Sequence, residues 1–199
     1  MPDRVILAST SSARQAMLRA AGLSFEAEAP RVDEAAVKAG LRAEGLPVRD
    51  QADALAEVKA LSISRLQPGF VIGADQMLAL GDKAFDKPES KEAAKAQLHA
   101  LSGRTHALFT AAVVARDGVA IWRHVSAPRL TMRRLSDDAI EDYLARAGEA
   151  AFASVGAYQL EGLGAQLFEG VDGDYFAVLG LPLLPLLGFL REHGVGGLV

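Results

Sequence analysis

The sequence has no cysteine, and this absence removes several classes of chemistry at once. Without thiols, the chain forms no disulfides, thiolate zinc sites or iron–sulfur clusters, and it has no cysteine nucleophile. A strong excess of basic residues is also lacking, because 21 Lys and Arg stand against 25 Asp and Glu and the net charge is −4. We therefore expect no nucleic-acid polymer as partner, and an anionic ligand must meet a local cluster of cations.

Long apolar runs are scarce as well. Met1–Ala8 lacks the extended apolar region of a signal peptide, so we expect a cytoplasmic protein. The uncharged segment Phe176–Leu190 is shorter than the roughly 20 apolar residues of a membrane span, and Pro182 and Pro185 interrupt it. We expect a buried strand followed by a helix there, and no membrane contact. Part of this segment, Leu181–Leu190, also suits a homodimer interface or another partner.

The residues that are present are sufficient for one hydrophobic core. Half of the 199 residues are hydrophobic and 23% are charged, which excludes a disordered chain. Short apolar strands alternate with amphipathic helices, and the sequence contains neither an internal repeat nor a linker between domains. This pattern predicts an α/β fold in a single domain over residues 1–199.

A strand, a polar turn and a helix open the chain. Val5–Ala8 is apolar and β-branched, Ser9–Ser12 supplies turn and capping residues, and alanines then recur at helical spacing up to Gly22. Arg14 lies in the first turn of that helix, where free backbone N–H groups already favour an anion. Taken alone, Arg14 is equally well explained as a solvated side chain.

Two other charged residues stand in apolar surroundings. Asp75 closes the apolar run Phe70–Ala74, and a carboxylate at the end of such a buried strand needs a metal ion or a cation beside it. Lys59 lies on an otherwise apolar face of a helix that we expect to begin at Asp50 and to end near Pro68. A lysine in that position also reaches solvent easily with its amine.

Turns and helix caps mark the remaining boundaries. After a short strand over residues 25–29 and a polar stretch with Asp33 and Glu34, we expect hairpin turns or helix caps at Gly81–Asp82, Ser90, Ser102–Gly103, Asp117–Gly118 and Ser136. Lys87 follows the first hairpin, next to a proline that stiffens the chain. By itself it is most simply a surface lysine.

Seven short segments also occur in a specific order: Leu7–Arg14, Val32–Glu34, Lys59–Ala60, Gly73–Gln76, Asp86–Pro88, Ser102–His106 and Gly180–Leu183. In residue types and in order they resemble the Maf family, from about Val5 to about Leu190. The resemblance implies a Maf/ITPase-like α/β fold, with a long twisted mixed sheet, flanking helices and a cleft between two lobes. It also implies a nucleoside triphosphate pyrophosphatase that hydrolyses the α–β anhydride with a divalent metal, Mg or Mn.

Carried over residue by residue, the resemblance assigns roles to individual side chains. Asp75 becomes the proton acceptor and a metal neighbour, and Glu34 a second acidic residue at the metal or the attacking water. Lys59 joins these two as a catalytic residue. The residues that hold the triphosphate are then Ser9, Arg14, Lys59 and Lys87.

The sequence departs from the family pattern at two positions. Ser12 and Ala13 precede Arg14 where the family usually has proline followed by arginine or an aromatic residue, so Ala13 supplies one phosphate or base contact fewer. The helix start is kept, because serine caps a helix as proline initiates one. Asp86 stands where glycine commonly precedes Lys87, and we expect it to add a negative charge beside that lysine.

The resemblance extends to the base. Gln76 and Glu161 match the 7-methyl-GTP branch of the family, whereas the dTTP and UTP branch has threonine and glutamine there. A carboxylate suits 7-methylguanine, because that base is cationic and offers N–H donors. Glu161 is equally well explained as a residue that caps a turn.

Two other functions are compatible with the same residues. One is a nucleotide-sensing protein that regulates cell division without turnover, and the other is a pyrophosphatase for noncanonical purine triphosphates such as ITP or XTP. Asp75, Glu34 and Lys59 favour the enzyme over the sensor, because a sensor needs cations but has no use for a carboxylate that activates water.

Overall fold

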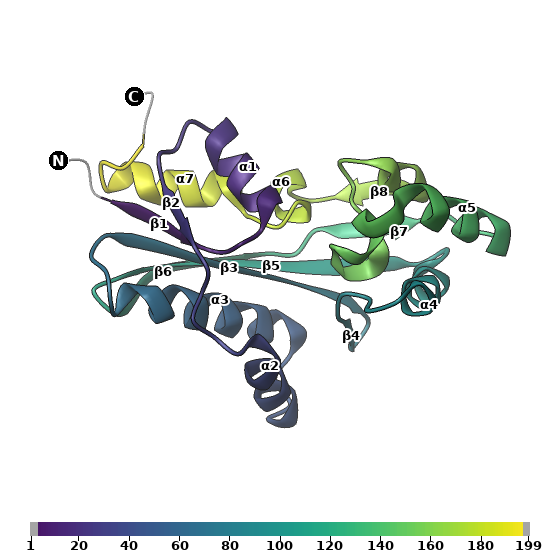
Figure 1. Cartoon of the computed structure of the whole chain (residues 1–199), viewed down its shortest axis with the longest axis horizontal. Coiled ribbons are helices and arrows are strands. Elements are labelled where there is room, and N and C mark those ends of the chain that lie inside the picture. The colour runs from purple at the N-terminus through teal and green to yellow at the C-terminus, as the bar shows by residue number, and fades with distance from the viewer. Residues whose placement is uncertain (1–3, 197–199) are drawn as a thin grey trace.

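The computed structural model of the chain describes residues 4–196, in which one mixed sheet of eight strands runs the length of the molecule (Figure 1). The strands are β1 (Val5–Ala8), β2 (Glu26–Glu28), β3 (Phe70–Leu80), β4 (Lys83–Phe85), β5 (Thr105–Arg116), β6 (Val119–Ser126), β7 (Arg129–Met132) and β8 (Phe168–Asp172). Their order is β2-β1-β3-β5-β7-β8, with β4 paired to β3 and β6 paired to β5. β1 runs parallel to β2 and β3, and the other pairs are antiparallel. The predicted α/β fold with a mixed sheet is confirmed.

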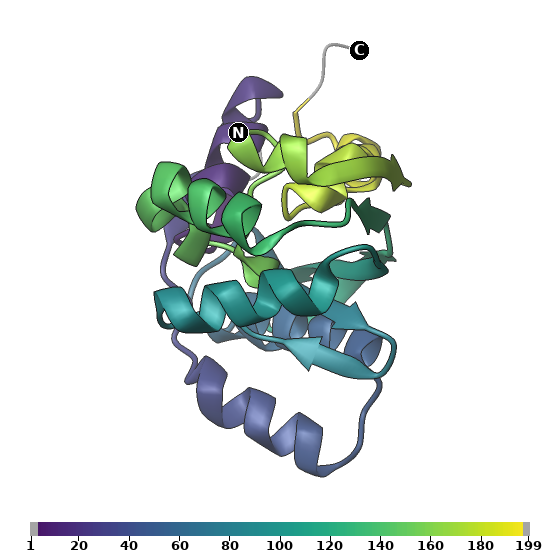
Figure 2. The ribbon, with the colours of Figure 1, turned by 90° about the vertical axis from the view of Figure 1, so that its right-hand side faces the viewer.

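Helices flank the sheet on both faces. They are α1 (Ser12–Ala20), α2 (Glu34–Ala43), α3 (Val48–Ser64), α4 (Lys91–Leu101), α5 (Asp137–Ala147), α6 (Tyr175–Val178) and α7 (Leu183–Glu192). In Figure 1, α1, α6 and α7 lie above the sheet, and α3 and α2 lie below it. The helices α4 and α5 lie with β4, β7 and β8 at the right-hand end of the molecule, the far end from the two termini. Figure 2 shows the same layers from that end.

The layers bury the apolar residues in three clusters. β1 contributes to two of them, because Leu7 packs with α1 and α7 on one face whereas Ile6 packs with α3 on the other. This explains why Val5–Ala8 is an unbroken apolar run. The third cluster fills the far end, around Leu98 and Ile140.

Most of the predicted turns and caps are confirmed. Ser90 Oγ accepts a hydrogen bond from Ala93 N at 3.1 Å at the start of α4, and Ser136 caps α5 in the same way. The Asp117–Gly118 hairpin has positive φ at both residues, which matches the twist of the strands it joins.

Two predicted strand features are wrong. β3 continues to Leu80, so Asp75 lies inside the strand and not at its end. The strand continues because β5 pairs with it beyond Asp75, as far as Ala79. The strand predicted at Phe176 is the short helix α6, because Asp174 Oδ1 accepts a hydrogen bond from Phe176 N at 2.9 Å and caps a helical turn.

The helical predictions also need correction near the N-terminus. α3 begins at Val48 after Pro47, and Asp50 lies within its first turn. The polar stretch at Asp33 and Glu34 opens a helix, α2, with Asp33 as its cap. α2 was missed because its only large apolar residues are Val37 and Leu41, which are only partly buried, so the apolar face that reveals a helix is narrow.

The apolar C-terminal segment is largely core. Leu183, Leu186 and Leu190 are buried against α1 and the sheet, and Leu184 remains 63% exposed. The homodimer interface suggested for this segment stays a prediction. Within residues 4–196, none of the helices has both the length and the apolar composition needed to cross a membrane.

Candidate active site

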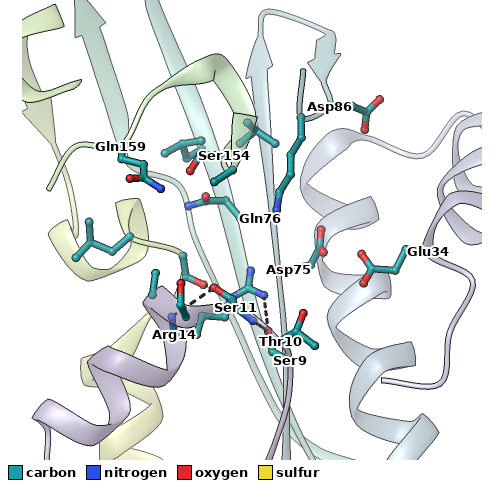
Figure 3. A pocket seen from close by; sticks show the side chains of 18 of the residues that line it. Ser9, Thr10, Ser11, Arg14, Glu34, Asp75, Gln76, Asp86, Ser154 and Gln159 are labelled. Atoms are coloured by element: carbon teal, nitrogen blue, oxygen red, sulfur yellow. Dashed lines mark hydrogen bonds between the residues drawn. The ribbon is translucent and has the colours of Figure 1, made fainter. Parts of the chain in front are cut away.

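All nine residues predicted for the site line one cavity of about 890 Å³ (Figure 3). They are Ser9, Ala13, Arg14, Glu34, Lys59, Asp75, Gln76, Lys87 and Glu161. They come from the turn after β1 and the start of α1, from α2 and α3, from the middle of β3, from the loop after β4 and from the segment before β8. The fold therefore brings together residues that are far apart in the sequence.

A lysine joins the two predicted carboxylates. Lys59 Nζ lies 2.7 Å from Asp75 Oδ1 and 2.8 Å from Glu34 Oε2. The side chains of Lys59 and Asp75 are 6% and 7% exposed, whereas Glu34 is 44% exposed. The buried carboxylate and the buried ammonium thus supply each other's counter-charge, and Glu34 extends the cluster toward solvent.

Gly73 allows this pairing. A Cβ at Gly73 would lie 2.1 Å from Ala56 O and 2.6 Å from Ala60 N, which are backbone atoms of α3. Only glycine therefore lets α3 pack so closely on β3. The close approach brings Lys59 to Asp75, two residues along the strand.

Asp75 keeps one oxygen without a protein partner. Its Oδ2 is buried and accepts no hydrogen bond from the described residues. Such an atom is costly unless a ligand or water meets it, and because Asp75 lines the cavity, a ligand or water bound there can supply the missing hydrogen bond.

The two carboxylates, Asp75 and Glu34, are too few to form a metal site alone, but they can share a divalent cation with a bound substrate. Among residues 4–196, no three His, Cys, Asp or Glu side chains are grouped to hold a metal ion. Mg²⁺, however, is commonly bound by one or two carboxylates together with waters and substrate phosphates. Asp75 and Glu34 fit that donor set.

Arg14 is held in place at the start of α1. Its Nε donates to Gly180 O at 2.8 Å and its Nη1 donates to Ser9 Oγ at 3.2 Å. Burial lowers the pKa of Arg14 from its ordinary value, and Asp75 and Glu34 partly offset this, but a guanidinium remains protonated. The cavity thus contains a pre-oriented cation beside the buried hydroxyl of Ser9.

Lys87 faces the same group of charges. Partial desolvation at the cavity wall lowers the pKa of Lys87, and repulsion from Arg14 lowers it further, whereas Glu34 raises it. Lys38 and Lys59 add smaller repulsions. Cations that repel one another in this way favour a ligand with several negative charges.

The expected effect of Asp86 on Lys87 is wrong. The Asp86 carboxylate points to α2, where Arg42 Nη2 donates to it at 2.8 Å and Lys38 Nζ lies 3.6 Å away. Two cations on α2 thus neutralise the charge of Asp86. Lys38 and Arg42 also line the cavity and were not predicted, although their spacing of four residues would have signalled one helical face.

The opposite wall holds the residues proposed to read the base. Gln76 Nε2 donates to Ala177 O at 2.8 Å, Val178 O at 3.1 Å and Thr110 Oγ1 at 3.0 Å, so the amide nitrogen secures α6 to the sheet. Glu161 lies exposed at the rim. Sequence reasoning missed three further lining residues, Ser154, Tyr158 and Gln159, because their segment has no regular periodicity.

The sequence of this chain is similar to a known protein family along almost its whole length. The model of the family described as Maf-like protein matches residues 4–193. A protein of Hyphomonas neptunium named nucleoside triphosphate pyrophosphatase is 58% identical over 191 residues, which cover 96% of each chain. A Caulobacter vibrioides protein with the same name is 55% identical over 190 residues, again 96% of each. A Brucella suis protein named 7-methyl-GTP pyrophosphatase is 52% identical over 194 residues, or 97% of this chain and 98% of its own. With this coverage and identity, the chain belongs to the Maf family.

Proposed function

We propose that this chain is a nucleoside triphosphate pyrophosphatase, a hydrolase that cleaves the α–β anhydride to give a nucleoside monophosphate and pyrophosphate. The observation that carries this function is the buried Lys59–Asp75 pair, with a free carboxylate oxygen, at the wall of a cavity lined with cations. Relatives that match nearly the whole chain carry the same name.

The cations hold the triphosphate. Arg14 at the start of α1 contributes N–H donors, and Ser9 in the turn before α1 contributes an O–H donor. Lys59 and Lys87 contribute ammonium groups from two other walls. An anhydride with several negative charges repels an incoming nucleophile, so neutralisation of its oxygens lowers the barrier. Binding in a fixed pose also aligns the α-phosphorus with the attacking water.

A divalent cation completes the site. Asp75 and Glu34 would hold it, and when bound it supplies positive charge to the phosphate oxygens and lowers the pKa of the attacking water. Mg or Mn fits these oxygen donors. Equilibrium dialysis of the two metals against the wild type and a Glu34→Gln variant tests this assignment without turnover.

Asp75 accepts the proton in the chemical step. A water oxygen forms a bond to the α-phosphorus, the bond from that phosphorus to the α–β bridging oxygen breaks, and the proton of the water moves to Asp75. The bridging oxygen leaves with pyrophosphate. Lys59 holds the carboxylate through Oδ1, and so leaves Oδ2 for the water.

The base preference is for 7-methyl-GTP. Glu161 supplies a carboxylate at the rim, which suits the positive charge and the N–H donors of 7-methylguanine. Gln76 lines the same wall, held by its amide nitrogen. Relatives named 7-methyl-GTP pyrophosphatase, from Brucella suis among others, support this preference.

The cavity is the cleft between two lobes of a single domain. One lobe is built on α1, α3 and α7 around two apolar clusters, one on each face of the sheet, and the other is built on α4, α5 and the segment 148–167 around the third cluster. Because β3 and β5 run through both, the lobes share one sheet.

A nucleotide panel tests the function. The protein is incubated with 7-methyl-GTP, GTP, UTP, dTTP, ITP and XTP, with Mg or Mn and with a chelator, and pyrophosphate and orthophosphate are both measured. We expect pyrophosphate as the direct product, fastest from 7-methyl-GTP and abolished by the chelator. Direct release of orthophosphate would refute α–β cleavage, a preference for ITP or XTP would indicate the noncanonical purine enzyme, and no product at all would indicate a sensor.

A further inference from the structure

We propose that Gln97 is a positioning residue that sets the spacing between the phosphate side and the base side of the cavity. The phosphate side is the loop Asp86–Pro88, and the base side is the segment 154–161. The names of the two sides rest on the proposed function. The bridge between them rests on the structure alone.

The base side is fixed at three consecutive residues. The hydrogen bonds are from Gly156 N to Gln97 Oε1 at 3.0 Å, from Tyr143 Oη to Ala157 O at 3.1 Å, and between Tyr158 Oη and His106 Nε2 at 2.7 Å. The partners come from α4, α5 and β5. The wall that faces the base is therefore shaped by side chains from three elements outside it.

The backbone at this point needs such support. Gly156 has φ +81°, and a Cβ there would lie 2.6 Å from Leu78 Cδ1. Ala157 also has a positive φ, 61°, which is unusual for a residue other than glycine. A backbone of this kind costs on the order of 1–3 kcal/mol and persists only where its surroundings hold it.

Gln97 differs from the other two supports because it also holds the phosphate side. Its Nε2 donates to Asp86 O at 2.8 Å, directly before Lys87. The orientation of the amide follows from its partners, since a backbone N–H needs an acceptor and a carbonyl needs a donor. The side-chain amide of Gln97, on α4, thus links the backbone of Asp86 to the backbone of Gly156.

The helix that carries Gln97 is itself well fixed. Ser90 caps α4, and Ala94, Leu98 and Leu101 are fully buried on its inner face. Gln97 lies at the edge of that face and outside the set of described residues that line the cavity. It therefore acts through its two partners and not on the substrate.

The spacing between the two sides matters for the reaction. A nucleotide that is bound by its base at one wall and by its phosphates at the other places the α-phosphorus at a position set by the distance between them. A displacement of about 1 Å can cost on the order of 100-fold in rate. Gln97 thus links base recognition to the alignment of the phosphorus with Asp75.

Two substitutions separate the two hydrogen bonds. Gln97→Glu keeps an acceptor for Gly156 N but places an oxygen against Asp86 O, whereas Gln97→Met, of similar length, keeps neither bond. The same changes at Gln166, an exposed glutamine outside the cavity lining, serve as matched controls. The readouts are the Kd of inorganic pyrophosphate by calorimetry and the ratio of kcat/KM for 7-methyl-GTP to that for UTP. This ratio does not depend on the fraction of folded enzyme.

We expect Gln97→Glu to raise the Kd of pyrophosphate by up to about fivefold, the factor that corresponds to one hydrogen bond, because the loop that carries Lys87 is no longer held at Asp86 O, and we expect the base ratio to stay within about twofold of wild type. Gln97→Met should raise this Kd and also reduce the base ratio, and both Gln166 variants should match wild type. The proposal is overturned if Gln97→Met changes neither quantity or only one, or if Gln97→Glu changes the base ratio as much as Gln97→Met does. If Gln97→Met does not fold, Gln97→Glu decides alone by the same expectation.

Amide hydrogen exchange separates this proposal from the function itself. Gly156 N–H should exchange faster in Gln97→Met but not in Gln97→Glu, and equal protection in all three proteins would overturn the bridge. If the wild type released no pyrophosphate from any nucleotide, the proposed function would fail, whereas the exchange experiment and the pyrophosphate Kd would still decide the role of Gln97.

Discussion

Lys59 and Asp75 form an ion pair at 2.7 Å between Nζ and Oδ1, with both side chains almost fully buried. The pair joins α3 to the middle of β3, and it orients the carboxylate so that Oδ2 is left without a partner. The stability of the fold and the proposed catalysis therefore involve the same two residues, and substitutions should separate the two roles.

Asp75→Asn should remove turnover and keep binding. The amide has nearly the shape of the carboxylate but accepts no proton, and loss of a general base costs typically 10²- to 10⁴-fold in rate. We expect kcat to fall by about that factor, with the Kd of a non-hydrolysable triphosphate changed only a few-fold.

Steady-state kinetics and calorimetry on the same preparation test this expectation. Asp82→Asn, in the exposed turn after β3, is the matched control and should keep the wild-type rate. A wild-type kcat in Asp75→Asn would show that another group accepts the proton.

Lys59→Met should destabilise the protein by about 3–5 kcal/mol, because it leaves the Asp75 carboxylate buried without a counter-charge. The double variant Lys59→Met with Asp75→Asn should recover part of this loss, since the amide needs no counter-charge. Urea unfolding measures the free energies.

The control for Lys59 is an exposed lysine. Lys91 pairs with Glu141 at 2.8 Å, with the two side chains 53% and 43% exposed, and Lys91→Met should cost less than about 1 kcal/mol. Two results would contradict this account: a loss of less than about 1 kcal/mol in Lys59→Met, or a double variant no more stable than Lys59→Met. Either would show that an unpaired Asp75 charge is not what destabilises Lys59→Met.

His106 should make stability depend on pH. Burial lowers the pKa of His106 to about 4, below the 6.5 of an unfolded histidine. Between these values the unfolded chain binds more protons than the folded one, so the free energy of unfolding decreases as the pH falls, by up to about 3 kcal/mol.

A comparison with His106→Gln isolates this contribution. Glutamine does not titrate, and it offers Tyr158 Oη a hydrogen bond in place of that from the ring. Urea unfolding at pH 7 and pH 4.5 should show a larger loss of stability for the wild type than for the variant. Equal losses in the two proteins would mean that His106 does not resist protonation in the fold.

Much of this site was predictable from residue types in sequence order. The elements that carry Arg14, Lys59 and Asp75 have the apolar periodicity of buried structure, which locates them without coordinates. α2 could not be found in this way, because only Val37 and Leu41 pack partly against the core and none of its residues is fully buried. With it, the pairing of Asp86 with Arg42 was also missed.

The bridge by Gln97 was equally beyond prediction. It depends on two hydrogen bonds to backbone atoms that are distant in sequence, at Asp86 and Gly156, and neither bond leaves a pattern in residue types. The left-handed backbone at Ala157 has no sequence signal either, since alanine rarely adopts it. Local propensity thus locates the elements, whereas the walls of the cavity follow from tertiary contacts.

Glu161→Gln should weaken the preference for the cationic base. A carboxylate accepts charge-assisted hydrogen bonds and attracts the positive ring of 7-methylguanine, and the amide keeps the shape without the charge. Such a bond is worth about 1.5–3 kcal/mol, so kcat/KM for 7-methyl-GTP relative to UTP should fall about tenfold or more.

Competition between the two nucleotides in one reaction measures this ratio directly. Glu169→Gln, at an exposed position on β8, is the matched control and should leave the ratio unchanged. If the ratio in Glu161→Gln equals that of the wild type, Glu161 does not read the base.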